Sequence, residues 1–325
     1  MIPSPLLRWP GAVPGEGEAA GVAAFYTNPY VEQRELEAGR GFVDLSHWRV
    51  LRGEHGAPHA REVLECDAAG RILSALLRCP GSGADIFLSP PGGPDCGMCP
   101  ANYIAIGTTT QGAARLRAAM QGQAGLSAIS WEDWWPGSDR VILLVEDIEV
   151  LARAGQAAGM SPVGLFAWTA YRVAARRPDP FRAARARARL ADIYGPAVVT
   201  HGGIVERGEI STECGAAGTA SERRGAERSL ACLYLEGPDE ADLPEAGTPV
   251  LAERSDEAVV GFVTSTVRHW EEGPLALALI REPTALGAVR VAEFRCGVEP
   301  IPLPAHVPVA VTIRESGEKS VVGRD

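Results

Sequence analysis

The sequence alternates short apolar runs with amphipathic stretches as far as residue 191, and contains only short apolar runs from residue 229 onward. Apolar runs of about four to eight residues predict strands, and apolar residues that recur every three or four positions predict helices. Strands are predicted at residues 42–45, 48–52, 86–89, 103–106 and 141–145, with a hairpin over residues 63–77. Helices are predicted at residues 29–39, 111–122, 148–158, 162–177 and 181–191.

The C-terminal third has a different pattern from the rest of the chain. Short strands separated by turns are predicted at residues 229–236, 249–253, 258–266, 274–279, 289–294 and 309–314. Regular spacing of this kind is typical of a β-barrel. Residues 202–225 have few large apolar side chains and predict a loop, and residues 1–24 predict a flexible lead-in. The expected organisation is a lead-in at residues 1–24, an α+β region at 25–225 and a barrel domain at 226–325.

The segment around residues 28–52 combines a capped helix with a polar corner between two strands. Asn28 is suited to cap a helix that has Pro29 at its first position and closes at Gly39. Asp44 and His47 then fall three residues apart at the corner. One interpretation is ligand contact or proton transfer, because histidine titrates near neutral pH and aspartate can orient it. The alternative is a turn held by hydrogen bonds from the side chains to the backbone.

Composition and charge limit the classes of partner. The formal net charge is −10 and 46% of the residues are hydrophobic, which indicates a globular protein with no overall attraction for nucleic-acid phosphates. No apolar run reaches about 18 residues, and the first residues are interrupted by proline and glycine, so neither a transmembrane helix nor a signal peptide is predicted. The odd number of cysteines, seven, favours a cytoplasmic protein with reduced thiols.

Cys96 and Cys99 form an isolated CxxC in a loop rich in proline and glycine. A structural zinc site needs about four ligands, and the sequence has neither a second CxxC nor suitably spaced histidines. A redox CxxC would need a following helix to lower the thiol pKa, and none is predicted there. We therefore predict no metal site. Phosphate-binding glycine loops, serine-hydrolase elbows and zinc-protease motifs are likewise absent from the sequence.

Two further stretches carry candidate chemistry. The segment THGGIVERGEISTECG gathers titratable groups in an irregular loop, among them His201, Arg207 and Glu209. Such a loop is either a binding site or a solvated surface. The segment EDWW at residues 132–135 places two carboxylates beside two indoles. It either forms a stacking surface for an aromatic ligand or packs in the core.

Three stretches resemble the folate-binding proteins related to the glycine-cleavage T-protein, and most closely the YgfZ-type members of actinobacteria. They are GFVDLSHWRVLR at residues 41–52, PVGLFAWTAYRVAARRP at 162–178, and residues 248–291, notably VVGFVTSTVRHWEEGPLALALIRE. The resemblance implies an α+β fold in which ferredoxin-like T-protein lobes surround a central pocket, followed by a C-terminal β-barrel. In relatives the pocket holds a reduced folate. The T-protein transfers a one-carbon unit from an aminomethyl donor to tetrahydrofolate, whereas YgfZ-type proteins are linked to the maintenance of iron–sulfur enzymes.

The motifs that carry the family's chemistry are altered in this sequence. The YgfZ signature K-G-C-Y-x-G-Q-E corresponds to GIVERGEI, with Val205 at the cysteine position. Ala174 stands where T-proteins have a glutamate that binds the pterin ring. The Asp-Asp-Gly of the family is replaced by CPGSGADIF, so its carboxylate is lost or shifted to Asp85. Loss of a buried acceptor leaves donors unpaired at about 1–3 kcal/mol each, so the scaffold is expected to persist with a changed ligand or reaction.

These observations lead to one leading hypothesis. The protein is a divergent folate-binding YgfZ/T-protein-like protein with a transferase-like pocket, in which Asp44, His47 and Glu209 serve the chemistry of one-carbon transfer. Arg172, His201 and Arg207 then bind the cofactor, tetrahydrofolate or a related folate, with Arg172 pairing with a ligand carboxylate. Two alternatives stay open: a tailoring enzyme of specialised-metabolite biosynthesis that acts on a non-folate substrate, and a non-catalytic maintenance factor that works with a partner protein.

Overall fold

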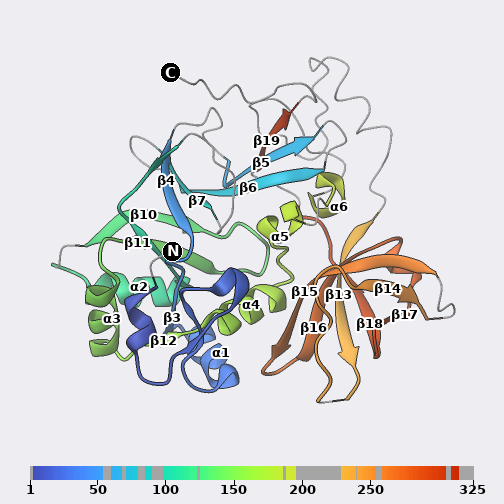
Figure 1. Cartoon of the computed structure of the whole chain (residues 1–325), viewed down its shortest axis with the longest axis horizontal. Coiled ribbons are helices and arrows are strands. Elements are labelled where there is room, and N and C mark those ends of the chain that lie inside the picture. The colour runs from blue at the N-terminus through green and yellow to red at the C-terminus, as the bar shows by residue number, and fades with distance from the viewer. Residues whose placement is uncertain are drawn as a thin grey trace.

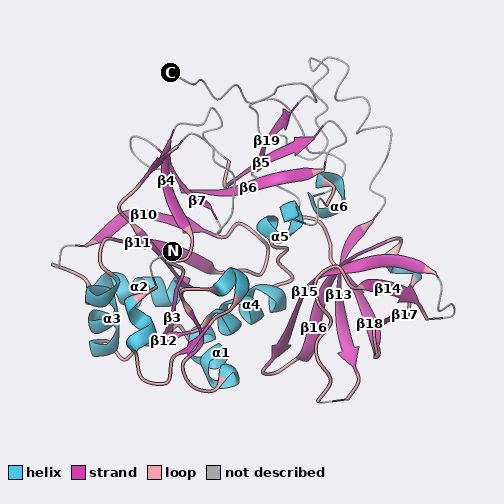
Figure 2. Cartoon of the chain, viewed as in Figure 1, coloured by secondary structure: helices cyan, strands magenta, loops and turns pink. Residues whose placement is uncertain are grey.

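The structure is a computed structural model. It describes residues 3–53, 60–67, 71–79, 85–89, 98–122, 125–185, 188–194, 228–238, 240–253, 258–304 and 309–314. Two large sheets, a two-stranded sheet, a set of helices and a closed barrel make up this part of the chain (Figures 1 and 2). None of the described helices has the length and apolar content that crossing a membrane requires.

The first sheet has the order β10-β11-β9-β3-β12. Its strands are β3 (Gly41–Asp44), β9 (Ile104–Thr109), β10 (Leu126–Glu132), β11 (Arg140–Val145) and β12 (Ser161–Val163). The succession β9-α2-β10-β11-α3-β12, with α2 at Thr110–Ala119 and α3 at Ile148–Ala157, is the ferredoxin-like βαββαβ arrangement with β3 inserted beside β9. Helices α2 and α3 cover one face, where Val141 and Leu143 are buried, and Ile142 and Leu144 belong to the opposite face.

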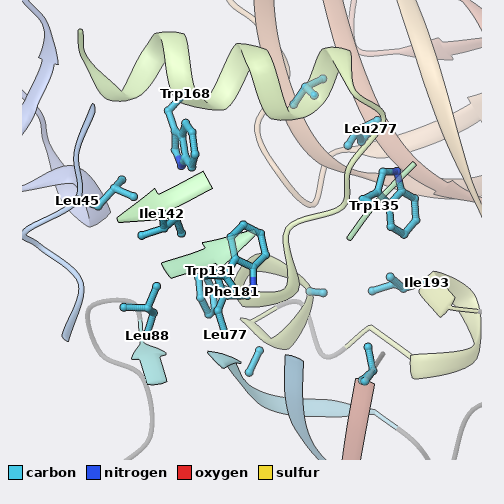
Figure 3. Close-up of a cluster of buried hydrophobic side chains, with 14 of the residues drawn as sticks. Leu45, Leu77, Leu88, Trp131, Trp135, Ile142, Trp168, Phe181, Ile193 and Leu277 are labelled. Atoms are coloured by element: carbon cyan, nitrogen blue, oxygen red, sulfur yellow. The ribbon is translucent and has the colours of Figure 1, made fainter. Parts of the chain in front are cut away.

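The second sheet has the order β19-β5-β6-β7-β4-β8. Its strands are β4 (Arg49–Gly53), β5 (Glu62–Asp67), β6 (Ile72–Cys79), β7 (Asp85–Ser89), β8 (Cys99–Pro100) and β19 (Val309–Arg314). The predicted hairpin of β5 and β6 is confirmed, and Asp67 accepts a hydrogen bond from the Arg71 N–H at its turn, at 2.9 Å. One face packs on the first sheet, because Leu77 and Leu88 share a buried cluster with Trp131 and Ile142 (Figure 3).

The predicted C-terminal barrel is confirmed as a closed barrel of six strands in the order β13-β16-β15-β14-β17-β18. The strands are β13 (Ser229–Glu236), β14 (Pro249–Ala252), β15 (Val259–His269), β16 (Gly273–Ile280), β17 (Ala288–Val291) and β18 (Phe294–Pro300). Along β13, Leu233 lies in the barrel interior cluster and Cys232 in the cluster shared with the lobes. Both faces of this strand are therefore buried, which explains its nearly continuous apolar sequence.

Two helices link the barrel to the first sheet. Helix α1 (Pro29–Glu37) is capped by Asn28, whose Oδ1 accepts from Tyr30 N at 2.9 Å and Val31 N at 3.3 Å, as predicted. Helix α4 (Leu165–Ala174) packs against α1 and against β15. The remaining helical elements are η1 (Pro5–Arg8), η2 (Gly17–Ala19), α5 (Pro180–Arg185), α6 (Leu190–Tyr194) and η3 (Pro283–Ala285), and β1 (Val13–Pro14) pairs with β2 (Ala23–Phe25).

Several predicted elements differ from the structure. The helix predicted over residues 162–177 is strand β12 followed by α4, because Gly164 is extended and lies so close to Ala24 that a Cβ would be 2.0 Å from its carbonyl oxygen. The strand predicted at 289–294 is a hairpin, with Ala292 in the left-handed conformation at its turn. The helix predicted at 181–191 is the two short helices α5 and α6.

The structure also has two features near the ends of the predicted domains that the sequence pattern did not predict. The described part of the lead-in is folded: Leu6 and Val22 are buried, and Leu6 packs in the cluster under α3. Strand β19 does not join the barrel but pairs in parallel with β5. The predicted boundary at residues 225/226 lies outside the described residues.

Candidate functional site

A cavity of about 660 Å³ lies where the first sheet, helices α1 and α4 and the barrel meet. Its size is in the range of pockets that bind small organic ligands. Aromatic side chains form much of the wall, and the described aromatic lining consists of Tyr30, His47, Trp48, Trp131, Phe166, Trp168 and Phe181. Trp168 descends from α4 toward the strand that carries Ile142 (Figure 3). Phe181 packs edge-on against Trp48, with ring centroids 5.2 Å apart.

The charge of the lining is opposite to that of the chain. Its described residues include five arginines, Arg140, Arg172, Arg177, Arg182 and Arg268, and two carboxylates, Glu16 and Asp179. The chain as a whole has a formal net charge of −10. A basic cavity in an acidic protein focuses a positive potential inside the pocket and attracts anions to it.

Arg172, predicted to bind the cofactor, lines the pocket and is 5% exposed. Its Nη1 donates to the Arg177 carbonyl oxygen at 2.7 Å and its Nη2 to Ser265 Oγ at 2.9 Å, whereas Asp179 Oδ2 is 4.0 Å from Nε. Burial lowers the pKa of Arg172 to about 9, because these mostly neutral partners do not replace the lost hydration. The guanidinium is charged at neutral pH and incompletely compensated.

Asp179 is a pocket residue that the sequence analysis missed. It caps α5 through Oδ1, which accepts from Phe181 N at 2.9 Å and Arg182 N at 3.2 Å. Burial opposes its ionisation, but Arg172, Arg182 and the two backbone N–H groups together lower its pKa below the usual value. The signal was present in the sequence, because an aspartate directly before Pro180 fits a helix N-terminus.

A second buried charge network is built around Arg177. Its Nε donates to Asp133 Oδ1 at 3.0 Å, and its Nη2 pairs with Glu62. The guanidinium lies over the rings of Trp134 and Trp135, at 5.0 and 5.2 Å from their centroids. The EDWW segment therefore holds an arginine by cation–π contacts and an ion pair, a role that neither interpretation of the sequence contained.

Asp44 and His47 lie at the predicted corner after β3. Asp44 Oδ1 accepts from Ser46 N at 2.8 Å, so the turn alternative is confirmed for Asp44. Burial raises the pKa of Asp44 and lowers that of His47 to about 4. His47 lines the pocket, whereas Asp44 is buried and is absent from the described lining. At neutral pH the imidazole is uncharged, so it can donate one hydrogen bond to a ligand and accept another from it.

The other sequence candidates lie elsewhere. His201, Arg207 and Glu209 are outside the described residues, as are Val205 and Cys96. Asp85, where the family carboxylate was expected to have shifted, is absent from the described pocket lining and forms a two-bond ion pair with Arg78 at 2.8 and 2.9 Å. Ala174 is likewise absent from that lining. Within the described residues, no three potential ligand side chains lie close enough together to hold a metal ion.

Gly107 on β9 sets the position of Trp168. A Cβ at this position would lie 3.0–3.1 Å from three atoms of the indole ring. We expect Gly107→Ala to displace Trp168 and lower the free energy of unfolding by about 1–3 kcal/mol, measured by urea denaturation. Gly297→Ala on β18, where no described atom lies within 4 Å of the added Cβ, is the matched control. Equal stability of both variants would show that the indole is not held against the strand.

The fold and the pocket together define the class of protein. Two lobes, each built on one of the large sheets, and a closed β-barrel surround a central cavity, and this is the T-protein-like architecture. A comparison with solved structures agrees with this. The chain is similar to the crystal structure of glycine cleavage system aminomethyltransferase T from Bartonella henselae, with a TM-score of 0.58 and 15% identity over 94% of this chain and 97% of that chain. No protein-family model matches the chain, and no curated protein matches it by sequence. The likeness shows the fold.

Proposed function

We propose that the central pocket binds a small anionic ligand with a flat aromatic part, and that this ligand is a reduced folate. The observation that carries the proposal is the pair of buried arginines, Arg140 and Arg172, in an aromatic-walled cavity. Burial lowers their pKa values to about 10 and about 9, so each guanidinium is stabilised when an anion enters. The structural neighbour is an aminomethyltransferase, which makes a folate the first ligand to test.

The pocket residues offer contacts to both parts of such a ligand, the anionic group and the aromatic ring. Arg172 pairs with a carboxylate of the ligand, since a guanidinium donates to both oxygens of a planar acid. Trp48, Trp168 and Phe181 line the cavity and offer apolar surface to the aromatic part of the ligand. His47, with a pKa of about 4, is too weakly basic to remove protons efficiently at neutral pH, and we propose that it orients the ligand by hydrogen bonding.

We further propose that the protein is a divergent YgfZ/T-protein-like member of the folate-binding proteins and that it handles a one-carbon unit. This rests on the sequence motifs around Asp44 and His47 and on the shared fold. His201, Arg207 and Glu209 stay candidate ligand-binding or catalytic residues of that reaction. Detection of formaldehyde-level transfer to tetrahydrofolate by mass spectrometry tests this step separately from binding.

Replacing Arg172 by methionine is expected to weaken folate binding about ten- to a hundred-fold, because charge-assisted hydrogen bonds contribute about 1.5–3 kcal/mol. Binding of 5-formyltetrahydrofolate, a stable reduced folate, is measured by calorimetry. Arg295→Met removes an exposed arginine of the barrel that pairs with Glu236 and Glu253, and its affinity is expected to equal that of the unaltered protein.

The same titration separates the folate from other anionic ligands. Saturation by 5-formyltetrahydrofolate below millimolar concentration, with affinity lowered about ten- to a hundred-fold in Arg172→Met and unchanged in Arg295→Met, supports the proposal. Absence of binding by any reduced folate sinks it. In that case a screen of aromatic acids that yields a binder favours the alternative of a non-folate substrate.

A further inference from the structure

Helix α4 ends in a turn that holds an arginine in a conformation usual for glycine. The Arg177 N–H donates to the Arg172 carbonyl oxygen at 3.1 Å. The Arg176 N–H donates to that of Val173 at 2.9 Å, which completes the Schellman pattern of a helix end. Arg176 follows the cap residue Ala175 and has a φ of 56°. A residue with a Cβ is strained in this left-handed conformation and persists there only where its surroundings hold it.

Contacts with the barrel hold Arg176 in this conformation. Its Nη1 and Nη2 donate to the two carboxylate oxygens of Glu272, at the turn between β15 and β16, at 3.1 and 2.8 Å. Nη2 also donates to Glu299 Oε2 on β18 at 3.0 Å, and the Tyr234 hydroxyl on β13 donates to the same oxygen at 2.6 Å. One arginine, with a side chain 20% exposed, therefore joins the end of α4 to three separate elements of the barrel.

The turn at Arg176 also sets the position of Arg172, the pocket residue that we propose pairs with the ligand carboxylate. The carbonyl oxygen of Arg177 turns back to α4 and accepts from Arg172 Nη1 at 2.7 Å. The other hydrogen bond of this guanidinium among the described residues is to Ser265 Oγ on β15, at 2.9 Å. Arg176 itself is absent from the described pocket lining, so its influence on a ligand passes through this carbonyl group.

We propose that Arg176 is a positioning residue of the ligand pocket. Its ion pairs with Glu272 and Glu299 keep it left-handed, and this conformation directs the next carbonyl group at Arg172. The inference deepens the proposed function and rests on it, because Arg172 is the residue through which Arg176 acts on the ligand. Contacts with the barrel thereby set the affinity of a site whose arginine belongs to α4.

The test compares two substitutions that both remove the contacts with the barrel. Leucine resists the left-handed conformation, whereas glycine adopts it without strain. We expect Arg176→Leu to raise the dissociation constant of 5-formyltetrahydrofolate, measured by calorimetry, about three- to ten-fold. Arg176→Gly lacks the same ion pairs and is expected to bind within about two-fold of the unaltered protein. In an Arg172→Met background, Arg176→Leu is expected to have no further effect on affinity.

A second pair of variants leaves the arginine in place. Glu272→Gln combined with Glu299→Gln weakens the ion pairs and is expected to lower the affinity, as the leucine variant does. Glu236→Gln combined with Glu253→Gln alters two exposed carboxylates that pair with Arg295 on the same barrel. This double variant is the matched control, and we expect it to bind as the unaltered protein does. If the leucine variant does not fold, the comparison of these two double variants decides in its place.

The Nε–H signal of Arg172 reports its position without any ligand. In protein labelled with ¹⁵N in arginine, this NMR signal is assigned by its absence from Arg172→Met. We expect it to shift in Arg176→Leu and to stay in place in Arg176→Gly.

The outcomes separate the positioning role from the proposed function. Equal losses of affinity in Arg176→Leu and Arg176→Gly overturn the inference, because the conformation of residue 176 would then not matter. Unchanged affinity in Arg176→Leu, or a loss that persists in the Arg172→Met background, overturns it as well and leaves the folate proposal intact. If no reduced folate binds, the proposed function falls and the Arg172 signal decides alone: a signal unmoved in Arg176→Leu then overturns the positioning role.

Discussion

Replacing Arg177 by methionine is expected to lower the free energy of unfolding by about 3–5 kcal/mol. The change leaves the Glu62 carboxylate buried without its cation and leaves Asp133 with Arg140 as its remaining cation, and breaking a buried pair by removing one partner has this cost. The loss extends beyond one contact, because Arg177 also lies over Trp134 and Trp135. Urea denaturation followed by circular dichroism at neutral pH measures it.

Two further variants test whether the stability lost in Arg177→Met comes from the buried charge network. Arg295→Met removes an arginine of similar size whose ion pairs are exposed, and its effect on stability is expected to be much smaller than that of Arg177→Met. Adding Glu62→Gln to Arg177→Met removes the charge that is left without its cation and is expected to restore part of the stability. A single Arg177→Met variant as stable as the Arg295→Met control would contradict the role assigned to the network.

The second large effect is a loss of stability in acid that depends on His47. Burial lowers the pKa of this imidazole from 6.5 to about 4, so the unfolded chain binds its proton before the folded protein does. The contribution of His47 to the free energy of unfolding is fully present above about pH 6.5 and is lost as the pH falls toward 4. The shift corresponds to about 3 kcal/mol at the acid end of that window. Unfolding free energies measured at pH 7 and at pH 4.5 give most of this difference.

A His47→Gln variant serves as the control, because glutamine does not titrate. We expect the loss of stability between pH 7 and pH 4.5 to be about 2–3 kcal/mol smaller in the variant. The raised pKa of Asp44 acts in the opposite sense, since a carboxyl that binds its proton more readily in the folded state favours folding at low pH. That contribution is common to both proteins and cancels in the comparison. Parallel pH profiles would mean that the imidazole is not held in a desolvated, uncharged state.

Local signals in the sequence predicted the elements well where each element depends on its own residues. The cap at Asn28, the turn at Asp67 and the first four strands predicted for the barrel are short-range features, and the structure confirms them. The helix start after Gly164 was mispredicted because it is set by the backbone of Ala24, which lies 140 residues earlier. Apolar periodicity contains no information about such a contact.

The pocket was only partly predictable for the same reason. His47 and Arg172 were found because their motifs resemble those of a known family, and both line the cavity. Arg140 lies in no quoted motif, and Arg177 was not singled out within the stretch at residues 162–178. The importance of both arginines arises from Asp133 and Glu62, which come from different sheets. Their role depends on burial and on these ion pairs, and both are properties of the assembled molecule.

The pairing of β19 with β5 has a mechanical consequence for the barrel. The chain enters the barrel after the lobes and returns to the second sheet after leaving it, so the barrel is attached to the lobes at both of its chain ends. A unit joined by a single linker is free to swing, whereas one fastened at two points has fewer ways to move. Ending the chain at residue 304 would remove β19 and with it one of the two connections, and would expose the edge of β5 without deleting any strand of the barrel. Ligand affinity measured on such a truncated chain would therefore report how far the pocket depends on the barrel being held in place from both sides.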